Sequence, residues 1–361
     1  MGGGYRSPKK SGGGGLIALI AVAVLLLGGI VALVVFVLSG KGGAIAADPS
    51  SLPPKQASAA HKHLPQGCDL VARANLAQMM EVPAVKAHLV PVLEDMKRAG
   101  SDPGSTQIST LVGVAGIDAD RDIKDVAVCA KGLDQPARSQ KVALVLGGDL
   151  RPETLVPAVE KVELRKRDKA EVSKLNGRLV ARTRASDGDT ILLGQAADGA
   201  IVVANDEALF AAATGDAAPR DSEYALPLQA DGAVTIAASA MRQAVAKGGP
   251  NPFLKDVNEI TRAVATASLA DARIELRFVT TSSRAAKGLA DIYGLVLAPM
   301  VRQQLASAKG KAPGVDVLMN AKAAVDGADF VLTAQGTAAD VEAAVRELAR
   351  ILREEKAGLA L

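Results

Sequence analysis

Hydrophobic and polar residues are distributed unevenly along the chain. Residues 16–38 (LIALIAVAVLLLGGIVALVVFVL) contain no charged and no strongly polar side chain. A helix of this length rises about 35 Å, enough to cross a bilayer core of roughly 30 Å. A surface helix of a globular domain would keep a polar face, which this run lacks. The pattern therefore predicts a transmembrane helix that contacts the lipid bilayer.

The charges on either side of this run predict its direction. Three basic residues and no acid lie within the Gly/Lys-rich residues 1–15, whereas only Lys41 follows the run before Asp48. The positive-inside rule places residues 1–15 in the cytoplasm and exports the rest to the periplasm or the cell exterior. Ala44-Ile45-Ala46 fits a cleavage site, but the apolar run is longer than a signal-peptide core. We expect an uncleaved signal-anchor in a single-pass protein of the bacterial inner membrane.

Beyond the run, the composition changes twice. Residues 39–63 are small, polar and Pro-containing, which is typical of a flexible linker. From residue 64 onwards, apolar residues alternate between strand and helix periodicities. The segment from Gly215 to Tyr224 again has the composition of a link, so we expect one unit at about 64–216 and a second at about 224–356.

The two units show a similar order of predicted elements. In the first, strands are expected at 69–76, 126–130 and 141–146, a helix at 151–162, and a hairpin whose turn is Asn176-Gly177. In the second, a strand at 233–240, a helix at 253–268, a strand at 273–280 and a helix at 283–305 precede a hairpin and a final helix. The predicted fold class is α+β: a tandem pair of α/β units with mixed or antiparallel sheets and packed helices.

Composition excludes several functions. The formal net charge is only +3, and aromatic residues make up 2% of the chain with no Trp. These values disfavour nucleic-acid binding, which uses basic surfaces and aromatic stacking platforms. Gly147-Gly148-Asp149 lies between a strand and a helix but lacks the phosphate-binding signatures of nucleotide sites. We expect no cofactor and no enzymatic activity.

The chain has two cysteines, Cys68 and Cys129. Both belong to the exported region, where thiols are oxidised. Each lies at or near a predicted strand, and those strands could be neighbours. Their spacing does not resemble C-x-x-C, so a disulfide is expected rather than a metal or redox pair.

Histidines are equally few: His61, His63 and His88. His61 and His63 belong to the predicted linker and lack a third ligand, so no metal site is expected. His88 borders the apolar stripe of a predicted helix and is interpreted as structural. No G-x-S-x-G motif accompanies it, which disfavours a histidine-based hydrolase.

Residues 161–184 hold nine basic side chains and three acidic ones. A solvated hairpin face is the simplest interpretation, but such a patch can also bind lipid headgroups, an anionic envelope polymer or an acidic envelope protein. The candidate polyanion contacts are Arg165, Lys166, Arg167, Lys169, Arg178, Arg182 and Arg184.

The stub at 1–15, the apolar run, the sequence LPQGCDLVARANL and the later DVAVCA resemble uncharacterised single-pass exported proteins of myxobacteria and related GC-rich bacteria. That resemblance implies no activity. The leading hypothesis is a membrane-anchored extracytoplasmic binding or scaffold protein. The alternatives are an envelope enzyme with an unrecognised carboxylate-based site and an accessory subunit of a membrane complex.

Overall fold

The computed structural model describes residues 53–92, 95, 115, 117–133, 135, 139–161, 171–184, 190–215, 224, 226–241, 258–299, 302–303, 317 and 319–359. The predicted span at 16–38 and the residues 1–15 lie outside these ranges. Within them, no helix is both long and apolar enough to cross a membrane.

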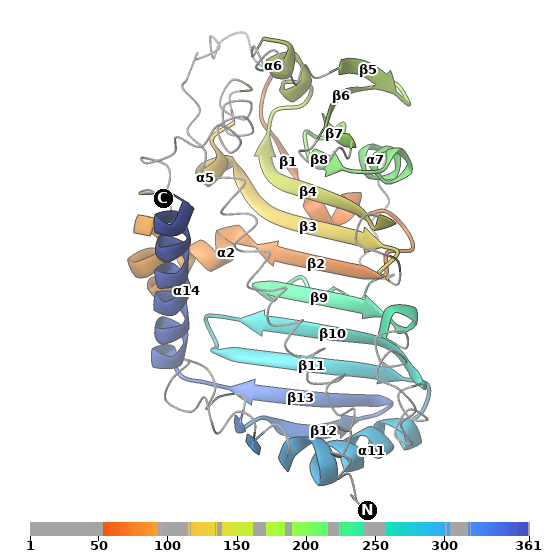
Figure 1. Ribbon diagram of the computed structural model, residues 1–361, viewed down its shortest axis with the longest axis vertical. Helices are drawn as coiled ribbons and strands as arrows, with labels where there is room; N and C mark the ends of the chain where they lie inside the picture. The colour runs from red at the N-terminus through yellow and green to blue at the C-terminus, as the bar shows by residue number, and fades with distance from the viewer. Residues whose placement is uncertain are drawn as a thin grey trace, which may run out of the picture.

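The described strands form one 13-stranded antiparallel sheet (Figure 1). Its order is β12-β13-β11-β10-β9-β2-β3-β4-β8-β7-β6-β5, and β1 pairs with β4 in addition. The strands are β1 Gln56–Ser58, β2 Leu70–Asn75, β3 Ile123–Lys131, β4 Lys141–Leu150, β5 Glu171–Leu175, β6 Arg178–Arg184, β7 Thr190–Gln195, β8 Ile201–Ala204, β9 Gly232–Ala237, β10 Ile260–Ser268, β11 Arg273–Thr280, β12 Lys322–Asp326 and β13 Asp329–Gln335.

The predicted fold class, a tandem pair of α/β units, is therefore wrong. The strands of both predicted units belong to the same sheet, joined where β2 pairs with β9 in the register Ala72↔Val234. Two separate sheets would each expose the edge of a long apolar strand, and pairing those edges removes that liability. Part of the error is local, because the helix expected at 253–268 overlaps strand β10.

The two halves of the sheet share a core connectivity, which β5 and β6 extend in the first half. In one half, β2, β3 and β4 form a meander, a helix follows, and β8 returns to pair with β4. In the other, β9, β10 and β11 form the meander, a helix follows, and β13 returns to pair with β11. The first strands of the two meanders, β2 and β9, are antiparallel neighbours. The shared elements of the two halves are therefore arranged as by a local two-fold axis between these strands.

Helices, most of them short, pack around the sheet. They are η2 Ala60–His63 (3₁₀), α2 Leu76–Glu81, η3 Val85–Leu89 (π), α5 Ala119–Asp122, α6 Leu155–Lys161, α7 Glu207–Thr214, α11 Ser283–Ile292, η5 Tyr293–Leu297 (π) and α14 Ala338–Leu359. Helices α6 and α11 pack in the core cluster on one face, whereas η2 and α7 pack in the cluster on the other. Since β2 contributes Ala72 to the first cluster and Val71 to the second, the central strand is buried on both faces.

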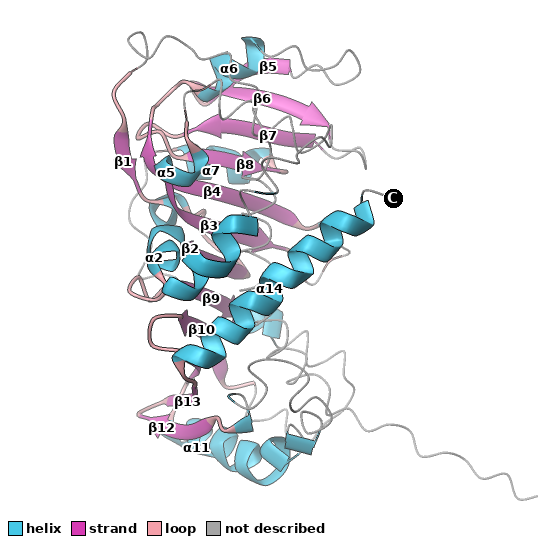
Figure 2. Cartoon of the chain, turned by 90° about the vertical axis from the view of Figure 1, so that its left-hand side faces the viewer, coloured by secondary structure: helices cyan, strands magenta, loops and turns pink. Residues whose placement is uncertain are grey.

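Helix α14 lies apart from these two clusters. It crosses the ends of the central strands beside the helical segment that follows β2 (Figure 2). Val345, Ala349 and Leu352 pack there against Val85 and Leu89. The helix begins with a capping box, in which Thr337 and Asp340 bond each other's backbone N–H groups.

Residues 53–63, which composition assigns to a flexible linker, lie along the edge of β4; we call them the strap. Ser58 exchanges hydrogen bonds with the backbone of Gly148, at 3.1 and 3.2 Å. The Ala60 N–H donates to the buried carboxylate of Asp125, whose two oxygens lie 3.1 and 3.3 Å away. This close approach requires Gly147, since a Cβ there would lie 2.2 Å from Asp125 Oδ1 and 2.5 Å from Ala60 N.

We predict that Gly147→Ala destabilises the protein by roughly 1–3 kcal/mol, because the added methyl group overfills the contact between the strap and β4. Chemical denaturation of the purified protein measures the change. Gly294→Ala is the control, since a Cβ at that helical position meets nothing within 4 Å. Equal stabilities for the two variants would contradict the close packing of the strap.

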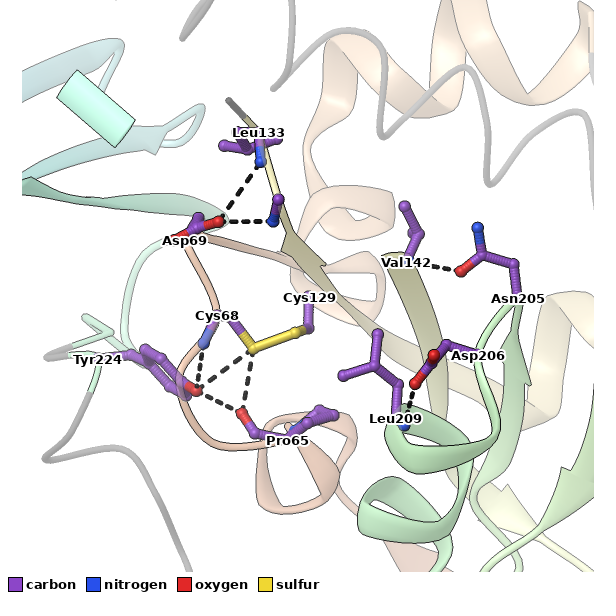
Figure 3. Close-up of a disulfide and its surroundings, with 11 residues drawn as sticks. Pro65, Cys68, Asp69, Cys129, Leu133, Val142, Asn205, Asp206, Leu209 and Tyr224 are labelled. Atoms are coloured by element: carbon purple, nitrogen blue, oxygen red, sulfur yellow. Dashed lines mark hydrogen bonds between the residues drawn. A yellow bond between two sulfur atoms is a disulfide. The ribbon is translucent and has the colours of Figure 1, made fainter. Parts of the chain in front are cut away.

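The predicted disulfide between Cys68 and Cys129 is confirmed, with Cα atoms 5.6 Å apart (Figure 3). Cys129 lies on β3, and Cys68 lies in the turn between the strap and β2. The Tyr224 hydroxyl donates to the Pro65 carbonyl and accepts from the Cys68 N–H at 3.3 Å. Tyr224 precedes β9, so this contact ties the start of the second half of the sheet to the disulfide.

We predict that replacing both cysteines by alanine lowers the free energy of unfolding by about 4 kcal/mol, because the bond closes a loop between residues 61 positions apart. Denaturation of the double variant and of the wild type, with and without reductant, measures this. Reductant should destabilise only the wild type. A wild type that is indifferent to reductant would show that the bond does not form.

Candidate functional site

The predicted basic segment is only partly within the described residues. Arg165, Lys166, Arg167 and Lys169 lie outside them. Arg178 and Arg182 lie on β6, and Arg184 is its last residue. The β5–β6 hairpin closes through Asn176 and Gly177, whose positive φ angles of 50° and 79° match the predicted Asn-Gly turn.

Two of these arginines are partly neutralised. The Arg182 guanidinium donates to the Glu207 carboxylate of α7 and, at 3.3 Å, to the Ser173 hydroxyl. Arg178 lies 3.8 Å from the Glu153 carboxylate, too far for a hydrogen bond. Lys174 on β5 has no ion-pair partner among the residues that the structure describes. Of Lys174, Arg178 and Arg182, the two with the least neutralised charge therefore lie near the hairpin turn.

A shallow pocket, partly open to solvent, lies at this turn, between the hairpin and α6. Leu179 pairs with Lys174 across the hairpin, and both belong to the strand face that α6 covers. The pocket combines an apolar wall with two cations and one carboxylate. It is lined by Glu153, Val156, Pro157, Lys174, Gly177, Arg178, Leu179 and Gln195.

Gln195 fixes the start of α6 next to the pocket. Its buried side chain accepts from the Leu155 N–H at 2.8 Å and donates to the carbonyls of Arg151 and Gly199 at 2.9 and 3.0 Å. Glu153, within the segment so held, has a φ of +58°, a left-handed conformation that costs energy for any residue with a Cβ. The pocket is thus preorganised, with a strained acidic residue at its edge.

The opposite end of the sheet carries charges that satisfy one another. Arg277 on β11 donates to Asp326 and Asp329 at 3.0 and 2.9 Å and to Glu275 at 3.2 Å. The hydrogen bond that Arg277 donates to Asp329 is the main reason why the pKa of Arg277 rises above its ordinary value. That network leaves little free charge for a ligand, unlike the hairpin pocket.

A polar cluster beneath the strap was not predicted from sequence. Asp122 accepts from Lys55 and from the Asp118 N–H, and Asp125 accepts from the strap and lies 3.9 Å from Arg73 Nε. Both carboxylates are buried. Each of the two acids accepts a hydrogen bond from the strap, Asp122 from Lys55 and Asp125 from the Ala60 N–H, so both hold the strap in place.

His63 makes a second contact between the strap and the core. Its Nδ1 lies 3.1 Å from the Ala213 carbonyl oxygen at the end of α7, and its Nε2 lies 2.9 Å from the Asp198 carboxylate. Each ring nitrogen therefore faces an acceptor oxygen from the core. In the described part of the chain, no group of three or more potential ligands could hold a metal ion.

Burial raises the pKa of Asp198. The hydrogen bond and charge of His63 and the N–H of Ala200 together lower it by more, so the pKa lies below its ordinary value.

No protein-family model matches the chain, and no curated protein matches it. Solved structures of TP0453 in crystal forms I, IV and III are similar at 11%, 11% and 10% identity with TM-scores of 0.37, 0.39 and 0.39. The alignments cover 81%, 84% and 83% of this chain and 98%, 97% and 99% of those chains.

We predict that Asp198→Asn lowers the free energy of unfolding by about 1 kcal/mol at pH 6, because a charged hydrogen bond between the strap and the β7–β8 turn is lost. A carboxyl whose folded pKa is lowered stabilises the fold above its unfolded pKa and loses that effect as pH falls through the folded pKa. The difference between variant and wild type should therefore shrink as the pH falls through the lowered pKa of Asp198.

Denaturant titrations at several pH values between 2.5 and 6 measure this difference. Asp149→Asn is a suitable control, because Asp149 pairs with Lys124 at the surface and such pairs contribute little. A difference for Asp198→Asn that grows on acidification would contradict the assignment.

Proposed function

We propose that the protein is a membrane-anchored extracytoplasmic binding or scaffold protein without catalytic activity. The apolar run at 16–38 anchors it in the bacterial inner membrane, with residues 1–15 in the cytoplasm and the sheet in the periplasm or outside the cell. The anchor is inferred from the residues themselves, since 23 successive positions carry no charge.

The observation that carries the proposal is the buried disulfide. Cys129 is fully buried and Cys68 nearly so, and the bond joins the strap region to the centre of the sheet. Structural disulfides form and persist in oxidising compartments and are rare in the cytosol. Export of the sheet agrees with this chemistry, and the direction agrees with the charge asymmetry of the flanking residues.

Binding rather than catalysis agrees with the chemistry of the described residues. The buried carboxylates Asp122 and Asp125 are engaged by the strap. The accessible charged pocket instead presents Lys174 and Arg178 to solvent beside apolar side chains. Cations so placed suit the recognition of a partner that carries negative charge, either an envelope protein or an anionic polymer.

Reporter fusions at the C-terminus test the topology. Alkaline phosphatase fused after Leu361 should be active in cells, and green fluorescent protein at the same place should be dark when exported through the general secretion pathway. Both results follow if the chain crosses the membrane once with its N-terminus inside. The matched control replaces residues 1–38 by a cytoplasmic start, which should reverse both readouts.

A second readout is the state of the cysteines in cells. Trapping free thiols at lysis should leave Cys68 and Cys129 unlabelled in the full chain and labelled in the control that lacks residues 1–38. Fluorescent C-terminal fusions with reduced cysteines in the full chain would contradict the proposed location.

A further inference from the structure

We propose that the pocket between α6 and the β5–β6 hairpin binds the phosphate headgroup of an anionic phospholipid in the membrane that anchors the chain. This inference rests on the proposed anchoring. It adds a second membrane contact, made by the folded region, to the one made by residues 16–38.

The position of the pocket makes this contact feasible. The Arg151 guanidinium donates to the Pro53 carbonyl at 2.5 Å, so the start of the strap is held two residues from Glu153 of the pocket. Only residues 39–52 separate the strap from the apolar run, and 14 residues reach at most about 50 Å. Strand β1, helix α6 and the hairpin lie at the same end of the molecule in both views (Figures 1 and 2).

The side chains suit a phosphate joined to an apolar body. Arg178 can present parallel N–H donors to phosphate oxygens, and Lys174 adds a point charge without a carboxylate partner in the described chain. Val156, Pro157 and Leu179 provide an apolar wall for the glycerol and the first acyl carbons. Leu179 is 36% exposed, a large apolar residue left open beside two cations.

Glu153 balances part of the positive charge of the pocket. Its carboxylate faces Arg178 at 3.8 Å, close enough to offset part of its charge but too far for a hydrogen bond. A bound phosphate would replace this weak contact with direct hydrogen bonds. Glycine would adopt the left-handed backbone of Glu153 without strain, so the carboxylate and the strain can be removed by one substitution.

The full chain in neutral detergent micelles tests the proposal by calorimetric titration. The probes are dihexanoyl phosphatidic acid, dihexanoyl phosphatidylcholine, glycerol 3-phosphate and inorganic phosphate. We expect saturable binding of the phosphatidic acid, with Lys174→Ala and Arg178→Ala each weakening it about five- to tenfold. Phosphatidylcholine and the two water-soluble phosphates should bind more weakly than the anionic lipid.

Matched variants control for charge and folding. Lys322→Ala removes an exposed lysine from β12 at the far end of the sheet and should leave binding unchanged. Glu153→Gly removes the competing carboxylate and the backbone strain together, so it should tighten binding. Circular dichroism establishes that each variant is folded.

Three results would overturn the proposal: no saturable binding of the anionic lipid, equal weakening by Lys322→Ala, or equal affinities for inorganic phosphate and the lipid. The last would identify a site for free anions instead of a membrane contact. None of these results affects the reporter fusions, so a failure of the lipid site is distinguishable from a failure of the anchoring.

Discussion

The antiparallel pairing of β2 with β9 is the constraint on which the remaining architecture depends. Five residues of each strand pair, from Leu70↔Ile236 to Ala74↔Gly232. Small side chains at Ala72, Ala74 and Ala233 let core clusters form on both faces of these strands. A shared core connectivity runs outward from this pair on each side, so the sheet extends in two directions from its centre. The disulfide strengthens the same region, since it joins β3 to the residues immediately before β2.

The candidate site lies at one end of this sheet because the strap and the hairpin both depend on β4 and its neighbours. The strap pairs with β4 and is held by Asp122, Asp125 and Asp198, which come from three different places in the chain. Helix α6 follows β4 in the chain, and the hairpin is joined to β4 in the sheet through β7 and β8. A rigid sheet therefore sets the distance between the pocket and the residue at which the chain leaves for the proposed anchor. This arrangement would place the cations near a membrane surface, at a fixed distance from the residue where the chain leaves the sheet.

Features that depend on a few neighbouring residues were predicted well from the sequence. The Asn176-Gly177 turn and the final helix follow from local rules, and the disulfide followed from cysteine count and compartment. Strand β10 was misassigned because Ile260, Ala263, Val264 and Ala267 also fit a helical spacing, although its threonines and β-branched residues favour a strand. The β2–β9 pairing, the ordered strap and the pocket join residues far apart in sequence. No local pattern specifies such contacts, so the two halves were interpreted as separate units.

Hydrogen exchange followed by mass spectrometry tests the central claim, that one continuous sheet is organised around β2 and β9. Peptides covering residues 70–75 and 232–237 should be among the slowest to exchange, and their protection should be lost together as denaturant is added. Strands β3 and β10, which flank them, should follow the same curve. If β9–β13 lost protection in a separate step while β2–β8 remained protected, the two halves would be independent units and the account would be contradicted.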